Sequence, residues 1–176
     1  PRKNLPRLLR AYRRYVQDNP RAKALKIAGG SGWGKQDIAA LLLELGLEGK
    51  VELLGRVDDS ELAALYRGAY ALLMPSRYEP CGLNQMYSLR YGTIPIVRET
   101  GGLADSVQQI VAGARQGTGV LFRDYDATGL AWAINRALDL FERKPLWRRV
   151  MRNGMAMDFS WEQQGAEYVD VFRALL

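Results

Sequence analysis

The sequence has no histidine and only one cysteine, Cys81, among its 176 residues. Without histidine, neither a Ser–His nor a Cys–His nucleophile pair can form. The same shortage leaves too few of the ligands that zinc prefers, so we expect no zinc site. A single cysteine cannot make a disulfide within the chain, which favours a reducing, cytoplasmic setting. These absences leave carboxylates, cationic side chains and backbone groups to carry any chemistry.

Long hydrophobic runs are missing as well. No stretch is long enough to cross a bilayer, so we expect no membrane span. The basic opening "PRKNLPRLLR" is not followed by an apolar core and a small-residue cleavage site, so we expect no signal peptide. A composition of 48% hydrophobic and 25% charged residues is ordinary for a soluble protein. The length suits one domain, residues 1–176, with a real hydrophobic core.

The charge balance is basic, with a formal net charge of +6. A positive surface suits an anionic ligand such as a nucleotide, a sugar phosphate or nucleic acid, although it also serves plain solvation. The basic residues are scattered along amphipathic helices and do not form a stripe with aromatic residues between them. That distribution argues against a nucleic-acid partner.

Short apolar strands alternate with amphipathic helices along most of the chain. Strands are expected within residues 22–30, 50–57, 70–76, 93–99 and 118–122, and helices within the segments between them. Asn4 is expected to cap the first helix. The alternation predicts an α/β fold, a Rossmann-like parallel sheet with helices on both faces. Three helices follow residue 122 without a strand, and we expect them to pack across the sheet or towards a neighbouring domain.

Three turns are candidates for anion binding, because ligands of such sheets bind beyond the carboxyl ends of the strands. They are "PRK" (1–3), "EPCGLNQ" (79–85) and "TGGLADS" (100–106), and each precedes a helix. A helix start attracts phosphate, and glycine lets a ligand approach the backbone. "AGGSGWG" (28–34) lacks the G-x-G-x-x-G spacing and is interpreted as a turn.

Glu79 lies in a constrained loop between Pro75 and Pro80. On spacing alone, two interpretations are equal: its carboxylate points into the crevice beyond the strands, or it caps the next helix. Cys81 is expected, by default, to be a small buried apolar residue.

The segment "PSRYEPCGLNQMYSLRYGTIPIVRETGGLADSV" strongly resembles the donor-binding motif of bacterial glycogen synthases and plant starch synthases. The likeness continues to about residue 172. Residues 1–74 resemble the wider family of retaining transferases that includes mannosyltransferases and sucrose synthases. Both families have the two-domain GT-B architecture, in which the carboxyl-terminal Rossmann-like domain grips the sugar nucleotide. The resemblance therefore implies the carboxyl-terminal domain of such an enzyme, with the amino-terminal domain missing.

The resemblance also implies site residues. Glu79 matches the glutamate that contacts the transferred sugar, where it orients the donor and stabilises developing positive charge. Lys3 matches the lysine that neutralises the donor diphosphate. The backbone segment beside the sugar and phosphates corresponds to Cys81, Gly82 and Leu83.

The third turn supplies further candidates for the sugar and phosphates, namely Thr100, Gly101 and Gly102. Arg56 and Tyr87 fall in the nucleoside region. Tyr87 stands where many retaining transferases have a second glutamate, and Arg56 stands near the place where glycogen synthases have an aromatic residue against adenine. The arginine that these families carry a few residues before the lysine would lie upstream of residue 1.

The implied function is the ADP-glucose-binding half of a retaining glucosyltransferase, inactive by itself, with an α-glucan acceptor in the full-length enzyme and no cofactor. A GDP-sugar or UDP-sugar transferase domain is the alternative enzyme, and a non-catalytic or engineered nucleotide-binding scaffold is the alternative outside enzymes. The change of resemblance near residues 74–76 has two explanations, a chimera joined there or one divergent natural synthase.

The resembled domain begins with a central strand that ends just before "PRKNL", and the sequence has no residues for it. We therefore expect "ALKIA" and "YALLM" not to pair directly, but to face each other across about 9–10 Å, two strand spacings. Three outcomes are open: another polypeptide or a swapped segment fills the interval, the two strands close directly on each other, or residues of the strand are missing from the sequence. We favour missing or displaced residues, because direct closure would shift every helix above and below the sheet.

Overall fold

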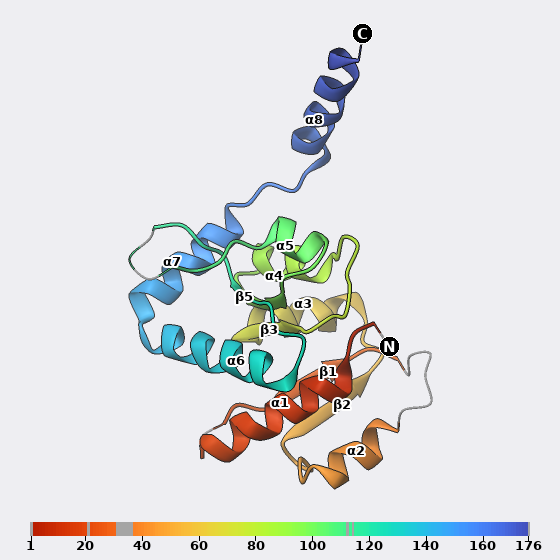
Figure 1. Cartoon of the computed structure of the whole chain (residues 1–176), viewed down its shortest axis with the longest axis vertical. Helices are drawn as coiled ribbons and strands as arrows, with labels where there is room; N and C mark the ends of the chain where they lie inside the picture. Colours follow the sequence, from red (N-terminus) through yellow and green to blue (C-terminus); the bar gives the residue numbers. More distant parts are fainter. Residues whose placement is uncertain (1, 21, 31–36, 112, 114, 176) are drawn as a thin grey trace.

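A computed structural model describes residues 2–20, 22–30, 37–111, 113 and 115–175. Its strands are β1 (Leu25–Ala28), β2 (Val51–Gly55), β3 (Ala71–Met74), β4 (Ile94–Arg98) and β5 (Val120–Phe122). Its helices are α1 (Leu5–Asp18), α2 (Ile38–Glu44), α3 (Asp59–Gly68), α4 (Asn84–Arg90), α5 (Gly102–Ser106), α6 (Ala127–Glu142), α7 (Lys144–Met155) and α8 (Trp161–Ala174). The predicted alternation of strands and helices is confirmed (Figure 1). Residues 31–34 of the "AGGSGWG" turn lie outside the described residues.

All paired strands are parallel, as the alternation predicts. β1 pairs with β2, and β4 lies between β3 and β5 in a second group of strands. The strands of the second group are short and apolar, and β4 is buried along nearly its whole length. Because parallel strands end at one edge, the loops that follow β3 and β4 emerge side by side.

The sheet is in two parts, because β1 is not hydrogen-bonded to β3. The expectation that these strands do not pair directly is confirmed, whereas the predicted interval and the strand that would fill it stay predictions. The beginning of the described chain lies against the second part, where the Arg77 N–H donates to the Arg2 carbonyl at 2.8 Å. Residues 2–3 are thereby held beside the carboxyl end of β3.

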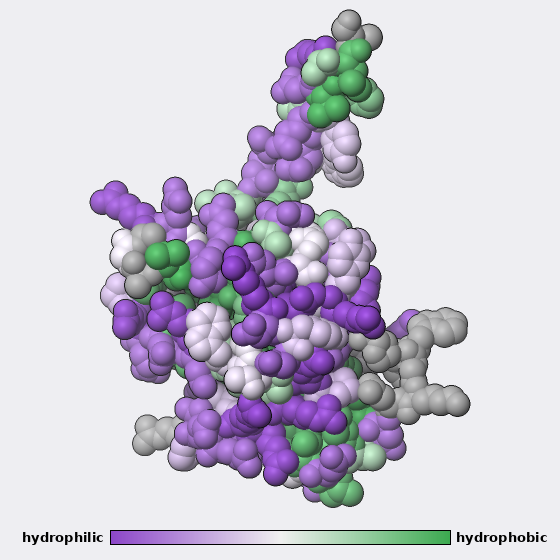
Figure 2. Space-filling model, in the orientation of Figure 1, coloured by the Kyte–Doolittle hydropathy of each residue, from purple (hydrophilic) through white to green (hydrophobic). Residues whose placement is uncertain are grey.

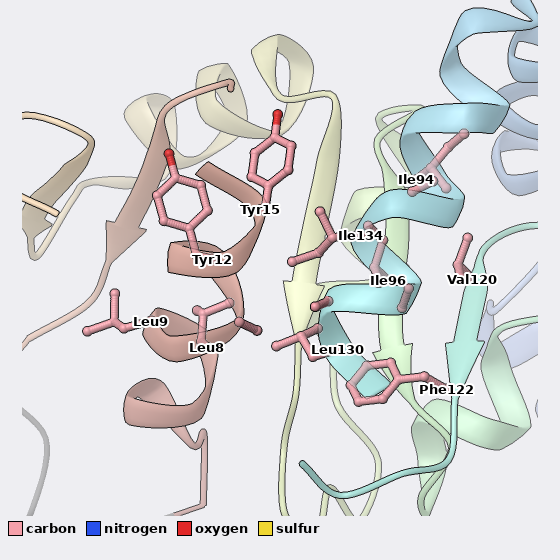
Figure 3. Close-up of a cluster of buried hydrophobic side chains, with 14 of the residues drawn as sticks. Leu8, Leu9, Tyr12, Tyr15, Ile94, Ile96, Val120, Phe122, Leu130 and Ile134 are labelled. Carbon is pink, nitrogen blue, oxygen red and sulfur yellow. The ribbon is translucent and has the colours of Figure 1, made fainter. Parts of the chain in front are cut away.

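One hydrophobic cluster connects the two parts of the sheet. Helix α1 contributes Leu8 and Leu9 to it, and both β1 and β3 pack partly buried side chains against it. In Figure 3, Leu8 and Tyr15 of α1 lie on the side of α6, β4 and β5, whereas Leu9 and Tyr12 lie on the other side of the helix. Fully burying one such leucine stabilises a fold by about 1.5–3 kcal/mol, so α1 is the main link between the two groups of strands.

The start of α1 differs from the prediction. Asn4 has a left-handed backbone, with φ of 59°, and its side chain does not cap the helix. Its Nδ2 donates instead to the Pro75 carbonyl at 3.2 Å. The side chain is therefore used to fasten the chain before α1 to the end of β3, a tertiary contact that local spacing does not reveal.

Of the last three helices, α6 and α7 pack on the rest of the domain and α8 does not. α6 and α7 pack on the body, with Phe141 and Trp147 meeting edge-on at 5.3 Å between ring centroids. α8 has no buried residue and projects away from the body (Figure 1). Its exposed apolar side chains, among them Trp161 and Phe172, give the projecting helix a hydrophobic surface (Figure 2). In the described part of the chain, every helix is too short or too polar to cross a membrane.

The Tyr12 hydroxyl connects α1 to the first pair of strands, because it lies 2.7 Å from the Lys23 carbonyl and 3.0 Å from the Lys50 carbonyl. Burial, with a smaller contribution from Tyr15, raises the pKa of Tyr12 from 10.0 to about 12. The folded state therefore keeps this hydroxyl protonated at pH values where the unfolded chain has lost the proton. Its contribution to stability is complete below pH 10 and is lost as the pH rises towards 12.

We expect Tyr12→Phe to lower the free energy of unfolding by about 1–2 kcal/mol at pH 7, because the carbonyls of Lys23 and Lys50 lose the one hydroxyl donor that they share. Urea titrations at pH 7 and in steps from pH 9.5 to 11.5 measure this. Between pH 10 and 11.5 the variant should lose less stability than the wild type. Tyr168→Phe, at an exposed position of α8, is the control, and equal behaviour of the two variants would contradict the assignment.

Candidate functional site

Glu79 lies in the loop after β3, and its side chain is only 4% exposed. Its Oε2 accepts a hydrogen bond from Lys3 Nζ at 2.7 Å and another from Ser76 Oγ at 3.2 Å. Arg2 Nη1 lies 3.3 Å from Oε1. α4 has Leu83 as its N-cap residue and no side-chain cap, so the interpretation of Glu79 as a helix cap is wrong. The carboxylate instead forms an ion-pair cluster with Lys3 and Arg2.

This cluster combines a buried anion with accessible cations. A buried carboxylate is tolerated where ion pairs and hydrogen bonds compensate for the lost hydration. The side chains of Lys3 and Arg2 are 48% and 56% exposed. Both cations therefore face solvent on one side and the carboxylate on the other, so that an anion from solution can reach them.

Lys3 reaches this position through the chain segment before α1. The Arg2 carbonyl accepts from the Arg77 N–H, and the Asn4 side chain donates to Pro75. Residues 2–4 are thus held at the carboxyl end of β3 from both sides of Lys3. The structure brings Lys3 and Glu79 together, as the resemblance implies.

The second and third turns of the sequence prediction also meet. The Gly102 N–H donates to the carbonyls of Glu79 at 3.0 Å and Pro80 at 3.2 Å. A Cβ added at Gly102 would lie 2.2 Å from the Cys81 carbonyl oxygen, and one added at Gly101 would lie 2.3 Å from the Glu79 carbonyl oxygen. Only glycine permits such close contact. The backbone of residues 100–102 therefore packs directly against the backbone of the loop after β3.

Cys81 and Leu83 are exposed, and the expectation of a buried Cys81 is therefore wrong. The segment after Glu79 passes over Gly102 and does not turn into the core, so the side chains of Cys81 and Leu83 are exposed. Gln85, which the sequence reasoning did not single out, fills the space beneath the loop and is fully buried. Its polar side chain on the buried face of the first turn of α4 is the signal that could have indicated a role.

The two nucleoside-region candidates lie apart from the ion-pair cluster. Arg56 follows β2, in the other part of the sheet, and its side chain lies over Gly30. The Tyr87 ring lies on α4, edge-on to Tyr66 at 6.5 Å between centroids. Among the described residues, no recorded contact connects either side chain to Glu79.

Two further arginines lie close to this edge and were missed from the sequence. Arg98, at the end of β4, donates from Nε to the Ser76 carbonyl at 2.8 Å and also bonds to the Arg77 carbonyl. The guanidinium carbons of Arg7 and Arg98 lie 3.7 Å and 4.9 Å from the centroid of the Tyr125 ring. Arg98 therefore adds positive charge beside the loop that carries Glu79, and Arg7 shares the Tyr125 ring with it.

The family model described as "Glycosyl transferases group 1" matches residues 1–151. The chain belongs to this family. Group 1 glycosyl transferases with a similar sequence include glycogen synthase of Thermotoga petrophila, 52% identical over 120 residues, which are 67% of this chain and 25% of that protein. Glycogen synthase of Desulforudis audaxviator is 54% identical over 110 residues, 62% of this chain and 22% of that protein. The chain thus spans about a quarter of these relatives.

The first of these matches extends across both halves of the sequence. A stretch of 120 residues is longer than the segment from residue 75 to the end of the chain, so the similarity to glycogen synthase begins upstream of residue 75. This overlap weighs against a join at residues 74–76, which stays a prediction.

Solved structures of the family confirm the fold class. The catalytic domain of starch synthase IV from Arabidopsis thaliana, bound to ADP and acarbose, has a TM-score of 0.66 and 23% identity, covering 94% of this chain and 42% of that one. Sucrose-phosphate synthase from Thermosynechococcus elongatus has a TM-score of 0.69 and 29% identity, covering 98% and 44%. This glycosyl transferase chain has the fold of the carboxyl-terminal GT-B domain.

We expect Gly101→Ala to destabilise the domain more than Gly46→Ala does. Both glycines have a positive φ, 48° at Gly101 and 63° at Gly46, but a Cβ at Gly46 meets nothing within 4 Å. Each alanine costs about 1–3 kcal/mol for the sparsely populated backbone conformation, and the clash at Gly101 adds about 1–3 kcal/mol. Urea unfolding measures both variants, and equal losses would show that the turn does not support the loop.

Proposed function

We propose that this chain is the sugar-nucleotide-binding half of a retaining glucosyltransferase of the glycogen synthase and starch synthase type, with ADP-glucose as the donor. The observation that carries the proposal is the cluster of Glu79 and Lys3 at the carboxyl edge of β3, enclosed by two glycine turns. Its chemistry suits a donor that has a sugar at one end of a diphosphate. The sequence similarity to glycogen synthases supports the choice of donor.

Lys3 acts on the diphosphate. Its ammonium is paired with Glu79 at 2.7 Å, yet about half of the side chain faces solvent. When the donor binds, a diphosphate oxygen takes over part of this interaction, and Arg2 adds a second positive charge. Cationic groups that are already in place stabilise the negative charge that develops on the leaving diphosphate.

Glu79 acts on the transferred sugar. Its carboxylate accepts hydrogen bonds from sugar hydroxyls, orients the ring and stabilises positive charge at the anomeric carbon. Because the carboxylate is buried and held by Ser76 as well as Lys3, its position is fixed before the donor arrives. It does not act as a base paired with histidine, since the sequence has none.

The backbone of residues 81–83 and of Thr100, Gly101 and Gly102 lies beside the sugar and phosphates. The nucleoside extends towards Arg56 and Tyr87, which come from the two parts of the sheet. Arg56 replaces an aromatic residue in this region, and a guanidinium can also stack on a base. A donor with a uracil or guanine base is the second candidate, and a nucleotide-binding domain without catalysis is the third.

The complete enzyme brings an amino-terminal domain and an α-glucan acceptor to the same edge, and it works in the cytoplasm. The projecting helix α8 supports the presence of a partner domain, because none of its residues is buried while Trp161, Tyr168, Phe172 and others are exposed. A large exposed apolar surface is typical of an interface.

Calorimetric titration with ADP, UDP and GDP tests the donor class. We expect ADP to bind best, while a preference for UDP or GDP would favour the second candidate. Absence of binding by all three would favour the non-catalytic domain.

We expect Lys3→Met to weaken ADP binding at least tenfold, because a charged hydrogen bond to phosphate contributes about 1.5–3 kcal/mol. Adenosine, which lacks phosphate, should bind the variant and the wild type alike if it binds measurably. Lys26→Met is the matched control, since Lys26 pairs with Glu52 on the surface at 3.1 Å. If the Lys3 variant binds ADP as tightly as this control does, Lys3 does not contact the diphosphate and the assignment is wrong.

The chain alone should not transfer glucose, because the residues that position the acceptor and exclude water belong to the other domain. Incubation of the purified chain with ADP-glucose and glycogen, followed by measurement of released ADP and glucan length, checks this. Robust glucan extension would refute it.

A further inference from the structure

We propose that Gln85 is a positioning residue whose buried carboxamide aims the N–H groups of Gly82 and Leu83 into the donor site. The proposal rests on the proposed function, because it names the groups of that site that receive an oxyanion of the donor. The residue does not touch the donor itself and acts through the loop above it.

The carboxamide of Gln85 lies beneath the loop and is fully buried. Its Nε2 donates to the carbonyl oxygens of Cys81 at 3.0 Å and Gly82 at 2.8 Å, and it lies 3.0 Å from Ser106 Oγ. Ser106 in turn donates to the Gly102 carbonyl. One side chain therefore connects both glycine turns of the site.

These bonds determine which way the loop peptides face. No peptide bond of the described chain is cis, and in a trans peptide the C=O and the following N–H point in opposite directions. The Cys81 carbonyl, held inwards by Gln85, directs the Gly82 N–H outwards. The Gly82 carbonyl does the same for the Leu83 N–H.

The preceding peptides of the loop follow the same pattern. The carbonyls of Glu79 and Pro80 accept from the Gly102 N–H, so four consecutive carbonyls are held beneath the loop. In the described chain, no hydrogen-bond acceptor is recorded for the N–H groups of Cys81, Gly82 or Leu83. Backbone donors that are oriented in advance and free suit an anionic oxygen.

The chemistry of the glutamine supports a role beyond packing. Its Oε1 is buried and has no hydrogen-bond partner in the described chain, a cost that an apolar side chain of similar size would avoid. The NH₂ group of the same carboxamide donates to two carbonyls. A carboxylate or an apolar side chain at this position could donate no hydrogen bond to them. Gly82 fits over the orphaned oxygen, since a Cβ there would lie 2.5 Å from Oε1.

Three variants of the chain test this assignment. Gln85→Met removes the donor, Gln85→Glu keeps the size but replaces the NH₂ group with an acceptor, and Ser106→Ala removes the third partner while leaving both carbonyl bonds in place. Circular dichroism and thermal melting establish that each is folded. ADP and adenosine are then titrated into each variant by calorimetry, and the amides of Gly82 and Leu83 are followed by ¹⁵N NMR.

We expect the two Gln85 variants to bind ADP at least tenfold more weakly than the wild type, while any measurable adenosine affinity stays within twofold. The NMR signals of Gly82 and Leu83 should shift or broaden in these variants. Ser106→Ala should keep its ADP affinity within threefold and keep both signals. A general packing role would instead weaken binding in step with melting temperature in all three variants, and that result would overturn the proposal.

The NMR comparison separates this proposal from the proposed function. If the wild type binds none of the nucleotides, the proposed function fails, and the signals of Gly82 and Leu83 still report whether Gln85 orients the loop. Unchanged signals in a folded Gln85 variant would overturn the orienting role whatever the wild type binds. If Gln85→Met does not fold, Gln85→Glu supplies the same comparison.

Discussion

A carboxylate that is almost fully removed from water requires opposite charge and hydrogen bonds around it, and Glu79 obtains the opposite charge from a distant part of the sequence. Lys3 and Arg2 come from the segment before α1, while Ser76 comes from the end of β3. Satisfying this one group therefore brings the beginning of the described chain to the carboxyl edge of the sheet. The bonds of Asn4 and Arg77 then hold it there. The same requirement leaves the cations half exposed, which is the property that an anion-binding site needs.

The glycine turns complete the arrangement through backbone contacts. Gly101 and Gly102 let the segment after β4 touch the loop after β3, at distances that any side chain would prevent. Gln85 also holds the loop from beneath, through the carbonyls of Cys81 and Gly82. The site is consequently built mainly from main-chain groups of two adjacent loops, with few functional side chains. This construction explains how a chain without histidine, and with one exposed cysteine, can present an ordered polar surface.

Much of the fold could be predicted from local pattern. The short apolar strands and amphipathic helices identified the parallel α/β architecture, and the rule that such strands end at one edge correctly brought "EPCGLNQ" and "TGGLADS" together.

Tertiary contacts could not be predicted from local pattern. Asn4 looked like a cap but bonds to Pro75, and Cys81 looked like a core residue but lies on a loop lifted over Gly102. Gln85 and Arg98 were missed because their roles depend on carbonyl groups that are distant or oriented by the fold. The assignments of Arg56 and Tyr87 came from resemblance and remain proposals.

The division of the sheet has a mechanical consequence. Arg56 follows β2, whereas Lys3 and Glu79 are fixed to β3, and no ladder of backbone hydrogen bonds joins β1 to β3. The two groups of strands are coupled chiefly through the side chains of α1, and contacts between side chains yield more readily than a continuous sheet does. Within the described residues, the part that carries Arg56 can therefore shift slightly against the part that holds the charged cluster. Such compliance would let the distance between Arg56 and Glu79 change while the contacts inside each part are kept.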